Sequence, residues 1–238
     1  MKLRTGSESV LVISDLQVPY EHPQARAFVN AVAEQINPTQ VVCIGDEVDQ
    51  HAISRFDPDP DADGPGVELR KAVRRLKKWY SDFPVVKVVT SNHTLRIYSK
   101  AFHAGIPEAY MRPINDWLQA PEGWEWADNV EIEGVRYEHG DAQGGMYAAR
   151  NLCVRNRQST VIGHHHSHGG VFYVANESEM IFGMNTGCLV DVNSLAFKYG
   201  KMATFKPTLG CGVVIGGVPY FVPMLLTRSG NWTGEVIL

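Results

Sequence analysis

Short apolar runs recur along the chain, and most of them are followed at once by polar residues. The three clearest runs cover residues 10–13, 41–44 and 85–89. A strand buried on both faces carries apolar side chains without alternation, so the first two runs predict buried strands. The run at 85–89, which includes Lys87, predicts a third strand. An amphipathic helical pattern at 23–35 lies between the first two runs. Together they predict a βαβ unit with a right-handed crossover.

The rest of the chain continues this alternation of strands, turns and helices. The expected elements are a helix at 67–80, short helices within the irregular aromatic region 98–126, strands at 130–132 and 135–138, a helix at 147–156, a strand at 161–162 and a hairpin of 213–215 with 220–222. Residues 57–66 read as an acidic, turn-rich loop. Because no repeat or linker interrupts the pattern, it predicts one α/β domain over residues 1–238.

Composition excludes several classes of protein. A chain of 238 residues with 44% hydrophobic residues is neither disordered nor fibrous. Its net charge of −4 gives the whole molecule no bulk attraction for nucleic acid. The four cysteines are too widely spaced for a disulfide framework or a CxxC zinc site. No secretory signal and no stretch of ~20 apolar residues is visible, which predicts a cytoplasmic protein without a membrane segment.

Residues of metal-ligand type follow five of the predicted strands. They are Asp15 and Gln17, Asp46 and Asp49, Asn92 and His93, His139, and His164 and His166. Loops at the carboxyl ends of strands carry the ligand-binding groups of open α/β sheets, so we expect these residues at one edge. Mixed imidazole and carboxylate donors suit zinc, manganese or iron. They outnumber the needs of one tetrahedral ion and predict two ions that share a carboxylate, an arrangement suited to phosphoryl displacement.

The order of these motifs is similar to that in a known family. Asp15-x-Gln17, Gly45-Asp46-x-x-Asp49, Asn92-His93, His139 and Gly163-His164-x-His166 resemble the motifs of the calcineurin-like metallophosphoesterases. The resemblance runs from about residue 10 to 190 and is closest to the small stand-alone members of bacteria and bacteriophages. It implies an α/β fold with a two-sheet β-sandwich flanked by helices. The expected location of the protein is the cytoplasm, or the host cytoplasm if a phage encodes it.

The resemblance also implies a role for each residue. The first of two divalent metal ions would be held by Asp15, Gln17, Asp46 and His166, and the second by Asp46, Asn92, His139 and His164. A hydroxide bridging the ions would attack a phosphate mono- or diester, and nucleotides are among the candidate substrates. His93 would stabilise the transition state or protonate the leaving oxygen, and Asp49 would orient His93.

Two positions depart from the family pattern. Gln17 stands where the family has histidine, and its neutral amide oxygen is a poorer donor for zinc or iron. If Gln17 is a ligand, the first site would favour manganese, with zinc, iron or nickel as further candidates. The alternative is that Gln17 does not bind the metal. A phosphate-binding arginine of the protein-phosphatase branch is absent, and Arg96 or Arg55 is our guess for a substitute.

Two other functions stay open at this point. A basic face on the helix expected at 67–80 favours a nuclease of the same superfamily that acts on DNA or RNA. Alternatively, Gln17 is a sign that catalysis has decayed and that the chain is an interaction module. The presence of His93 argues against decay. This residue binds no metal in the scheme above, so a chain that had lost catalysis would be expected to lose it first.

Overall fold

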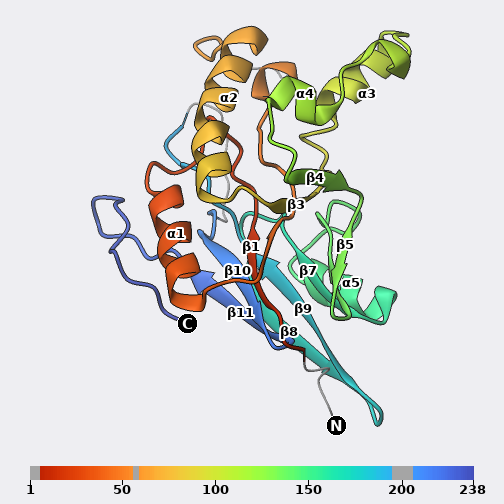
Figure 1. Ribbon diagram of the computed structural model, residues 1–238, viewed down its shortest axis with the longest axis vertical. Helices are drawn as coiled ribbons and strands as arrows, with labels where there is room; N and C mark the ends of the chain where they lie inside the picture. The colour runs from red at the N-terminus through yellow and green to blue at the C-terminus, as the bar shows by residue number, and fades with distance from the viewer. Residues whose placement is uncertain (1–5, 56–58, 195–205) are drawn as a thin grey trace.

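The apolar runs at 10–13, 41–44 and 85–89 form the centre of a six-stranded sheet in the computed structural model, which describes residues 6–55, 59–194 and 206–238 (Figure 1). The strand order is β11-β10-β1-β2-β3-β4. The strands are β1 (Ser9–Ile13), β2 (Gln40–Cys43), β3 (Val86–Val89), β4 (Trp124–Ala127), β10 (Gly210–Ile215) and β11 (Val218–Pro223). Strands β1 to β4 are parallel, and β10 and β11 extend the sheet antiparallel to β1.

A second sheet of five strands packs against the first. Its order is β5-β6-β7-β9-β8. The strands are β5 (Val130–Ile132), β6 (Val135–Tyr137), β7 (Ser159–Ile162), β8 (Gly169–Ala175) and β9 (Met180–Thr186). The central strands β6, β7 and β9 run parallel, while β5 and β8 pair antiparallel at the two edges.

Alternate residues of β1 enter two different apolar cores. Leu11 and Ile13 face helices on the outside of the first sheet. Val10 and Val12 face the second sheet and pack in one cluster with side chains such as Phe182. Because both faces are buried, residues 10–13 of this strand are all apolar. The expected two-sheet α/β sandwich flanked by helices is confirmed.

Helices cover the outer faces of both sheets. They are α1 (Ala25–Ile36), α2 (Pro65–Asp82), α3 (Arg96–His103), α4 (Ile114–Leu118) and α5 (Ala148–Asn156), with 3-10 turns η1 (His51–Ile53) and η2 (Glu108–Tyr110). Helices α1 and α2 lie on the first sheet and α5 lies beside the second, while α3 and α4 stand beyond β4 (Figure 1). Among the described residues, no helix is both long and apolar enough to span a membrane.

The structure corrects two of the expected boundaries. The end of the region 98–126 forms strand β4 rather than a helix, because Trp124 is buried and its indole Nε1–H donates to Phe83 O at 2.8 Å. The expected loop at 57–66 ends early, because Pro65 already occupies the first position of α2, where a proline lacks no needed donor. Residues 57 and 58 of that loop lie outside the described residues.

Helix α5 approaches β9 so closely that only glycine fits at position 183. A Cβ atom there would lie 2.3 Å from the backbone oxygen of Ala149. We therefore expect Gly183→Ala to push α5 away and to lower the free energy of unfolding by about 1–3 kcal/mol. Urea denaturation followed by circular dichroism measures this change. Gly144→Ala is the control, since a Cβ there meets nothing within 4 Å; equal losses in both variants would contradict the packing argument.

Candidate metal centre

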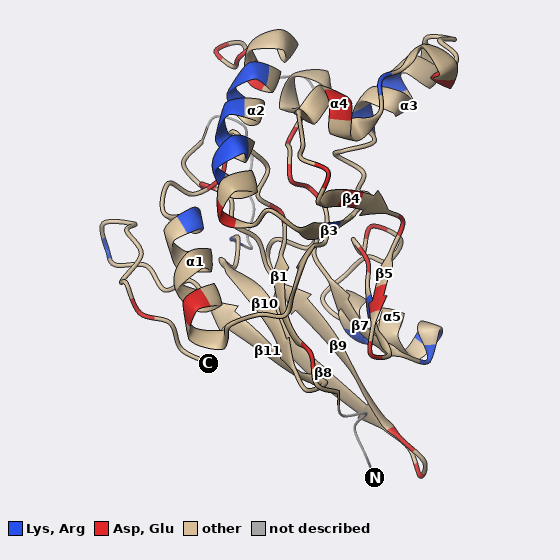
Figure 2. Ribbon diagram, in the orientation of Figure 1, with Lys and Arg blue, Asp and Glu red and all other residues tan. Residues whose placement is uncertain are grey.

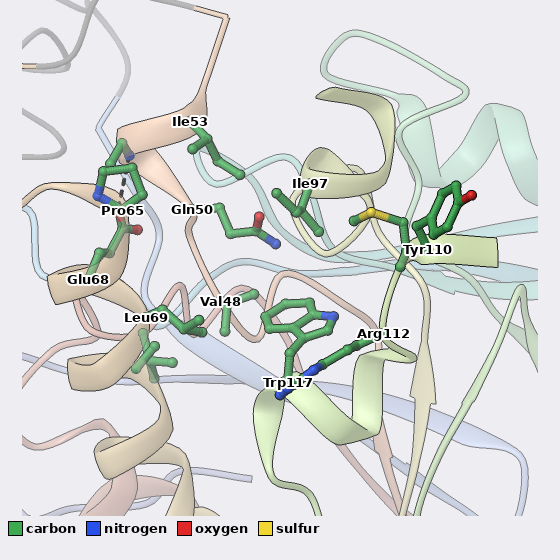
Figure 3. A pocket seen from close by; sticks show the side chains of 14 residues that line it. Val48, Gln50, Ile53, Pro65, Glu68, Leu69, Ile97, Tyr110, Arg112 and Trp117 are labelled. Atoms are coloured by element: carbon green, nitrogen blue, oxygen red, sulfur yellow. Dashed lines mark hydrogen bonds between the residues drawn. The ribbon is translucent and has the colours of Figure 1, made fainter. Parts of the chain in front are cut away.

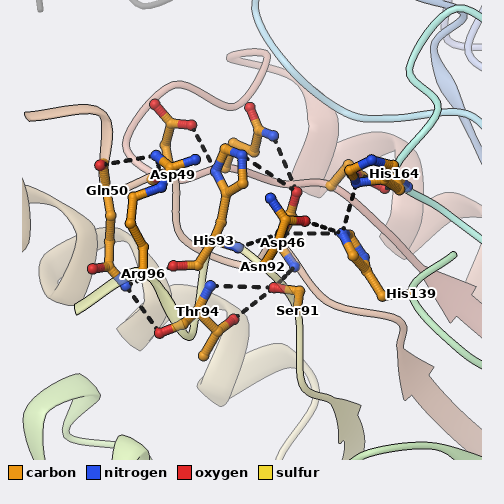
Figure 4. A network of polar contacts seen from close by, with 12 residues as sticks. Asp46, Asp49, Gln50, Ser91, Asn92, His93, Thr94, Arg96, His139 and His164 are labelled. Carbon is orange, nitrogen blue, oxygen red and sulfur yellow. Dashed lines mark hydrogen bonds and ion pairs between the residues drawn. The ribbon is translucent and has the colours of Figure 1, made fainter. Parts of the chain in front are cut away.

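The polar residues that follow five strands meet at one edge of the sandwich. Loops after β1, β2 and β3 come from the first sheet, and loops after β6 and β7 come from the second. Figure 4 shows His139 and His164 facing Asp46, with His93 and Asp49 on the other side of that carboxylate. The structure therefore brings together residues that are far apart in the sequence, as the motif order predicted.

The carboxylate of Asp46 lies at the centre of the group and is 1% exposed. Its Oδ1 lies 3.4 Å from His139 Nε2, and its Oδ2 lies 3.8 Å from His93 Nε2. Burial alone would raise the pKa of this carboxyl, but the charges of His139 and His93 outweigh it and hold the pKa well below its usual range. Asp46 is thus an anion in a site largely closed to water.

A first group of potential ligands consists of Asp46, His139 and His164. His139 Nδ1 lies 2.9 Å from Ile44 O, so this nitrogen carries the hydrogen and Nε2 faces the site. Asn92 Oδ1 lies 2.8 Å from His139 Nε2, and His164 Nδ1 lies 3.1 Å from the same atom. Three donor atoms therefore converge beside the Asp46 carboxylate.

A second group consists of Asp15, Asp46 and His166. His166 Nε2 lies 3.1 Å from Asp15 Oδ1. Gln17 reaches the same place, because its Nε2 donates to Asp46 Oδ2 at 3.4 Å and lies 3.2 Å from His166 Nε2. Its Oε1 is buried and has no hydrogen-bond partner. A buried amide oxygen without a partner is unusual and fits a cation ligand.

The turn after β7 comes close to the turn after β1. A Cβ atom on Gly163 would lie 2.0 Å from Ser14 Oγ and 2.3 Å from Asp15 Oδ2, so only glycine allows this approach. The backbone N–H of His164 then donates to Asp15 Oδ2 at 3.0 Å. The glycine of the Gly163-His164-x-His166 motif therefore positions two potential ligands from different sheets.

His93 stands beside the two groups and contacts acidic residues on both sides. Its Nδ1 lies 3.0 Å from Asp49 Oδ1, opposite the Nε2 that faces Asp46. Burial lowers the pKa of His93, but the carboxylates of Asp46 and Asp49 outweigh that effect and the pKa is raised. The ring is 16% exposed, so this imidazole can hold a proton next to solvent.

The two arginines suggested for phosphate binding are placed differently. Arg96 Nη1 donates to the backbone oxygens of Asp49 and Gln50, at 2.8 and 3.0 Å. This guanidinium therefore fixes the loop that carries Asp49. Arg55 is exposed just beyond η1. Phosphate contact by either residue stays a prediction.

Sequence reasoning missed a buried network beneath Asp46. Ser91 Oγ accepts the backbone N–H of Asp46 at 2.9 Å. Thr94 Oγ1 links Ser91, at 2.8 Å, to the carboxylate of Glu47, at 2.9 Å. Glu47 is fully buried, and burial raises its pKa to about 7. Only the spacing of Ser91 and Thr94 around Asn92-His93 could have drawn attention to this network.

Comparisons with known proteins give only remote likenesses. No family model and no curated protein matches the chain. The structure of vacuolar protein sorting 29 from Cryptosporidium parvum is similar, with 15% identity, coverage of 97% of this chain and 95% of that chain, and a TM-score of 0.47. Vps29 of Chaetomium thermophilum gives 11% identity, the same coverages and a TM-score of 0.49.

YfcE, described as a phosphoesterase from E. coli, gives 15% identity, coverage of 96% of this chain and 98% of that chain, and a TM-score of 0.40. TM-scores below 0.5 at such identities carry no argument about what this chain does.

The contact between Asp49 and His93 predicts a change in titration. A carboxylate favours the charged imidazolium, so Asp49→Asn should lower the pKa of His93. An NMR titration of the histidine ring signals in metal-free protein measures this. Asp82→Asn, which removes a carboxylate paired with Arg26, is the control and should leave His93 unchanged. An unaltered pKa in Asp49→Asn would remove Asp49 as the partner of His93.

Proposed function

We propose that the chain is a hydrolase that cleaves phosphate mono- or diesters with the help of two divalent metal ions, manganese foremost. The observation that carries the proposal is that Asp46 belongs to both groups of potential ligands. Two-metal phosphoryl transfer needs two ions about 3.5–4 Å apart, and a carboxylate shared by two cation sites would hold them that close. The ordered motifs that resemble the calcineurin-like metallophosphoesterases support the same reaction class.

The donor atoms present fit this pair of ions. One ion would be held by Asp15, Gln17, Asp46 and His166, and the other by Asp46, Asn92, His139 and His164. The Gln17 amide would have to turn over to offer its unpartnered Oε1 to the ion, because Nε2 is the atom beside Asp46 and His166. Ile44 O fixes the tautomer in which His139 Nε2 faces the site. When bound, the ions would lower the pKa of water to make a nucleophile and offset charge on the phosphoryl oxygens.

The chain's own acid for this reaction would be His93. Its Nε2 faces Asp46 in the site, and a proton given from this ring to the leaving oxygen would make departure of the alcohol easier. Asp49 holds the opposite ring nitrogen, and Arg96 in turn holds the backbone of Asp49. Both residues act on the position of His93, and a contact of Arg96 with the phosphate stays a prediction.

Activity with model esters tests the proposal. With added Mn²⁺, the protein should hydrolyse p-nitrophenyl phosphate or bis-p-nitrophenyl phosphate. His93→Ala should keep its metal content, measured by mass spectrometry, and lose about 10²–10⁴-fold in kcat, the usual contribution of a general acid.

His103→Ala is the matched control, because this histidine is exposed on α3. Failure of the wild-type protein both to bind metal and to cleave either ester would refute the proposed function. Full activity in His93→Ala would remove only the role of that residue.

Nuclease activity is the second candidate, and one surface favours it. The exposed face of α2 is strongly basic (Figure 2). Two of its cations are paired, since Lys71 contacts Asp63 at 2.5 Å and Arg75 contacts Glu21 at 2.8 Å. Within the described part of the chain, four others form no ion pair: Arg70, Arg74, Lys77 and Lys78. Unpaired cations in a row suit a phosphate backbone.

Charge reversal on α2 separates the two candidates. If a nucleic acid is the substrate, Arg74→Glu with Lys78→Glu should slow its cleavage and reduce the slope of log rate against log salt by about 2, one for each lost phosphate contact. Hydrolysis of p-nitrophenyl phosphate should not change. The control is Arg150→Glu with Arg155→Glu on α5, which makes the same change of net charge away from α2 and should leave cleavage of the nucleic acid nearly unchanged. Equal effects of both double variants would exclude α2 as a nucleic-acid surface.

A further inference from the structure

A cavity of about 280 Å³ lies next to the metal-binding loops, and none of the roles described above uses it. It is open to solvent on one side and is lined by residues of η1, of the first half of α2 and of the segment from 110 to 117. Figure 3 shows Leu69 on one side of the cavity, Tyr110 on the opposite side and Trp117 between them.

The cavity shares its wall with the loops that carry the candidate ligands. Val48 and Gln50, which flank Asp49, both line it, and so does Val18, the residue after Gln17. The two loops are tied to each other, because the backbone N–H of Asp49 donates to Val18 O at 3.2 Å. Both sequence neighbours of Asp49, the residue that contacts His93, therefore line the cavity.

Gln50 connects the cavity directly to His93. Its amide nitrogen donates to the backbone oxygens of His93 and Thr94, at 2.9 and 3.2 Å. The leaving oxygen of an ester must lie beside His93 to receive its proton. An organic group attached to that oxygen has an apolar cavity close by, because Gln50 both contacts His93 and lines the cavity.

The lining suits an apolar, flat group. Most of its side chains are apolar, and Trp117 and Tyr110 add aromatic surface. The few polar groups are already engaged or solvated. The Glu68 carboxylate accepts the backbone N–H groups of His51 and Ala52 at 2.8 and 2.9 Å, and Arg112 is exposed. A nucleobase would find few partners for its donors and acceptors here, whereas a hydrocarbon ring needs none.

Resting on the proposed function, we propose that this cavity binds the organic group of the substrate, and that the substrate is a phosphate ester of an apolar aromatic alcohol. The metal-binding edge recognises the phosphate, and the cavity between η1, α2 and Trp117 recognises the ring. Leu69 is then a specificity-determining residue on α2, remote from the metal ligands in the sequence.

Filling the cavity tests this inference. Leu69 lines it and is 37% exposed, so Leu69→Trp adds bulk without entering the core. The matched control is Val67→Trp, which makes a similar change on the same helix at a residue that is 38% exposed and does not line the cavity. The substrates are 1-naphthyl phosphate, whose ring fits the proposed class, and methyl phosphate, which has no ring.

Because naphthol is a much better leaving group than methanol, the wild-type ratio of kcat/KM for 1-naphthyl phosphate to that for methyl phosphate serves as the reference. Leu69→Trp should lower this ratio about tenfold, through KM. Val67→Trp should keep the wild-type ratio. Hydrolysis of both esters with the same ratio in all three proteins would overturn the inference and leave the proposed function standing. Hydrolysis of neither ester by a wild-type protein that binds metal and cleaves one of the p-nitrophenyl esters would overturn the inference alone; failure to bind metal and to cleave any of these esters would overturn the proposed function as well.

Discussion

The buried negative charge of Asp46 is the constraint on which the rest of the site depends. Removing a carboxylate from water costs several kcal/mol unless charged or hydrogen-bonding partners replace the solvent. Here the partners come from His139, His93 and Gln17, and the backbone N–H of Asp46 is itself held by Ser91. Since His139 belongs to the second sheet and the others to the first, the charge is tolerated only when both sheets are in place.

The loops around this charge adopt unusual backbone conformations. Asp15, Gln17, Asp46 and His164 all have positive φ, between 47° and 62°. Each such residue costs about 1–3 kcal/mol, and residues of this kind gather at functional sites. Hydrogen bonds between the loops offset part of the cost, for example from Gln17 N–H to Asp46 O at 2.8 Å. The positive φ values bend the chain just after each strand. The side chains of these four residues therefore point into the candidate metal centre.

The sequence predicts the parts of this architecture that depend on local pattern. Continuous apolar runs such as 10–13 mark strands buried on both faces, and their polar ends mark the functional edge. Strand β4 was not predictable, because Trp124 is fixed by a contact with Phe83 and not by neighbours in the sequence. The roles of Ser91 and Glu47 were hidden for the same reason. The cavity beside Gln50 depends on packing between α2 and a segment about 40 residues later, which no single-sequence pattern encodes.

The junction between Gly163 and Asp15 has a thermodynamic consequence. The potential ligands of each proposed ion come from loops of both sheets, with Asp15 and Asp46 on one side and His139, His164 and His166 on the other. A cation held between them acts as a cross-link that the unfolded chain cannot reproduce. Its binding free energy therefore adds to the stability of the whole sandwich, in proportion to the logarithm of the free cation concentration. Binding of a cation would therefore both raise the free energy of unfolding and fill the candidate metal centre.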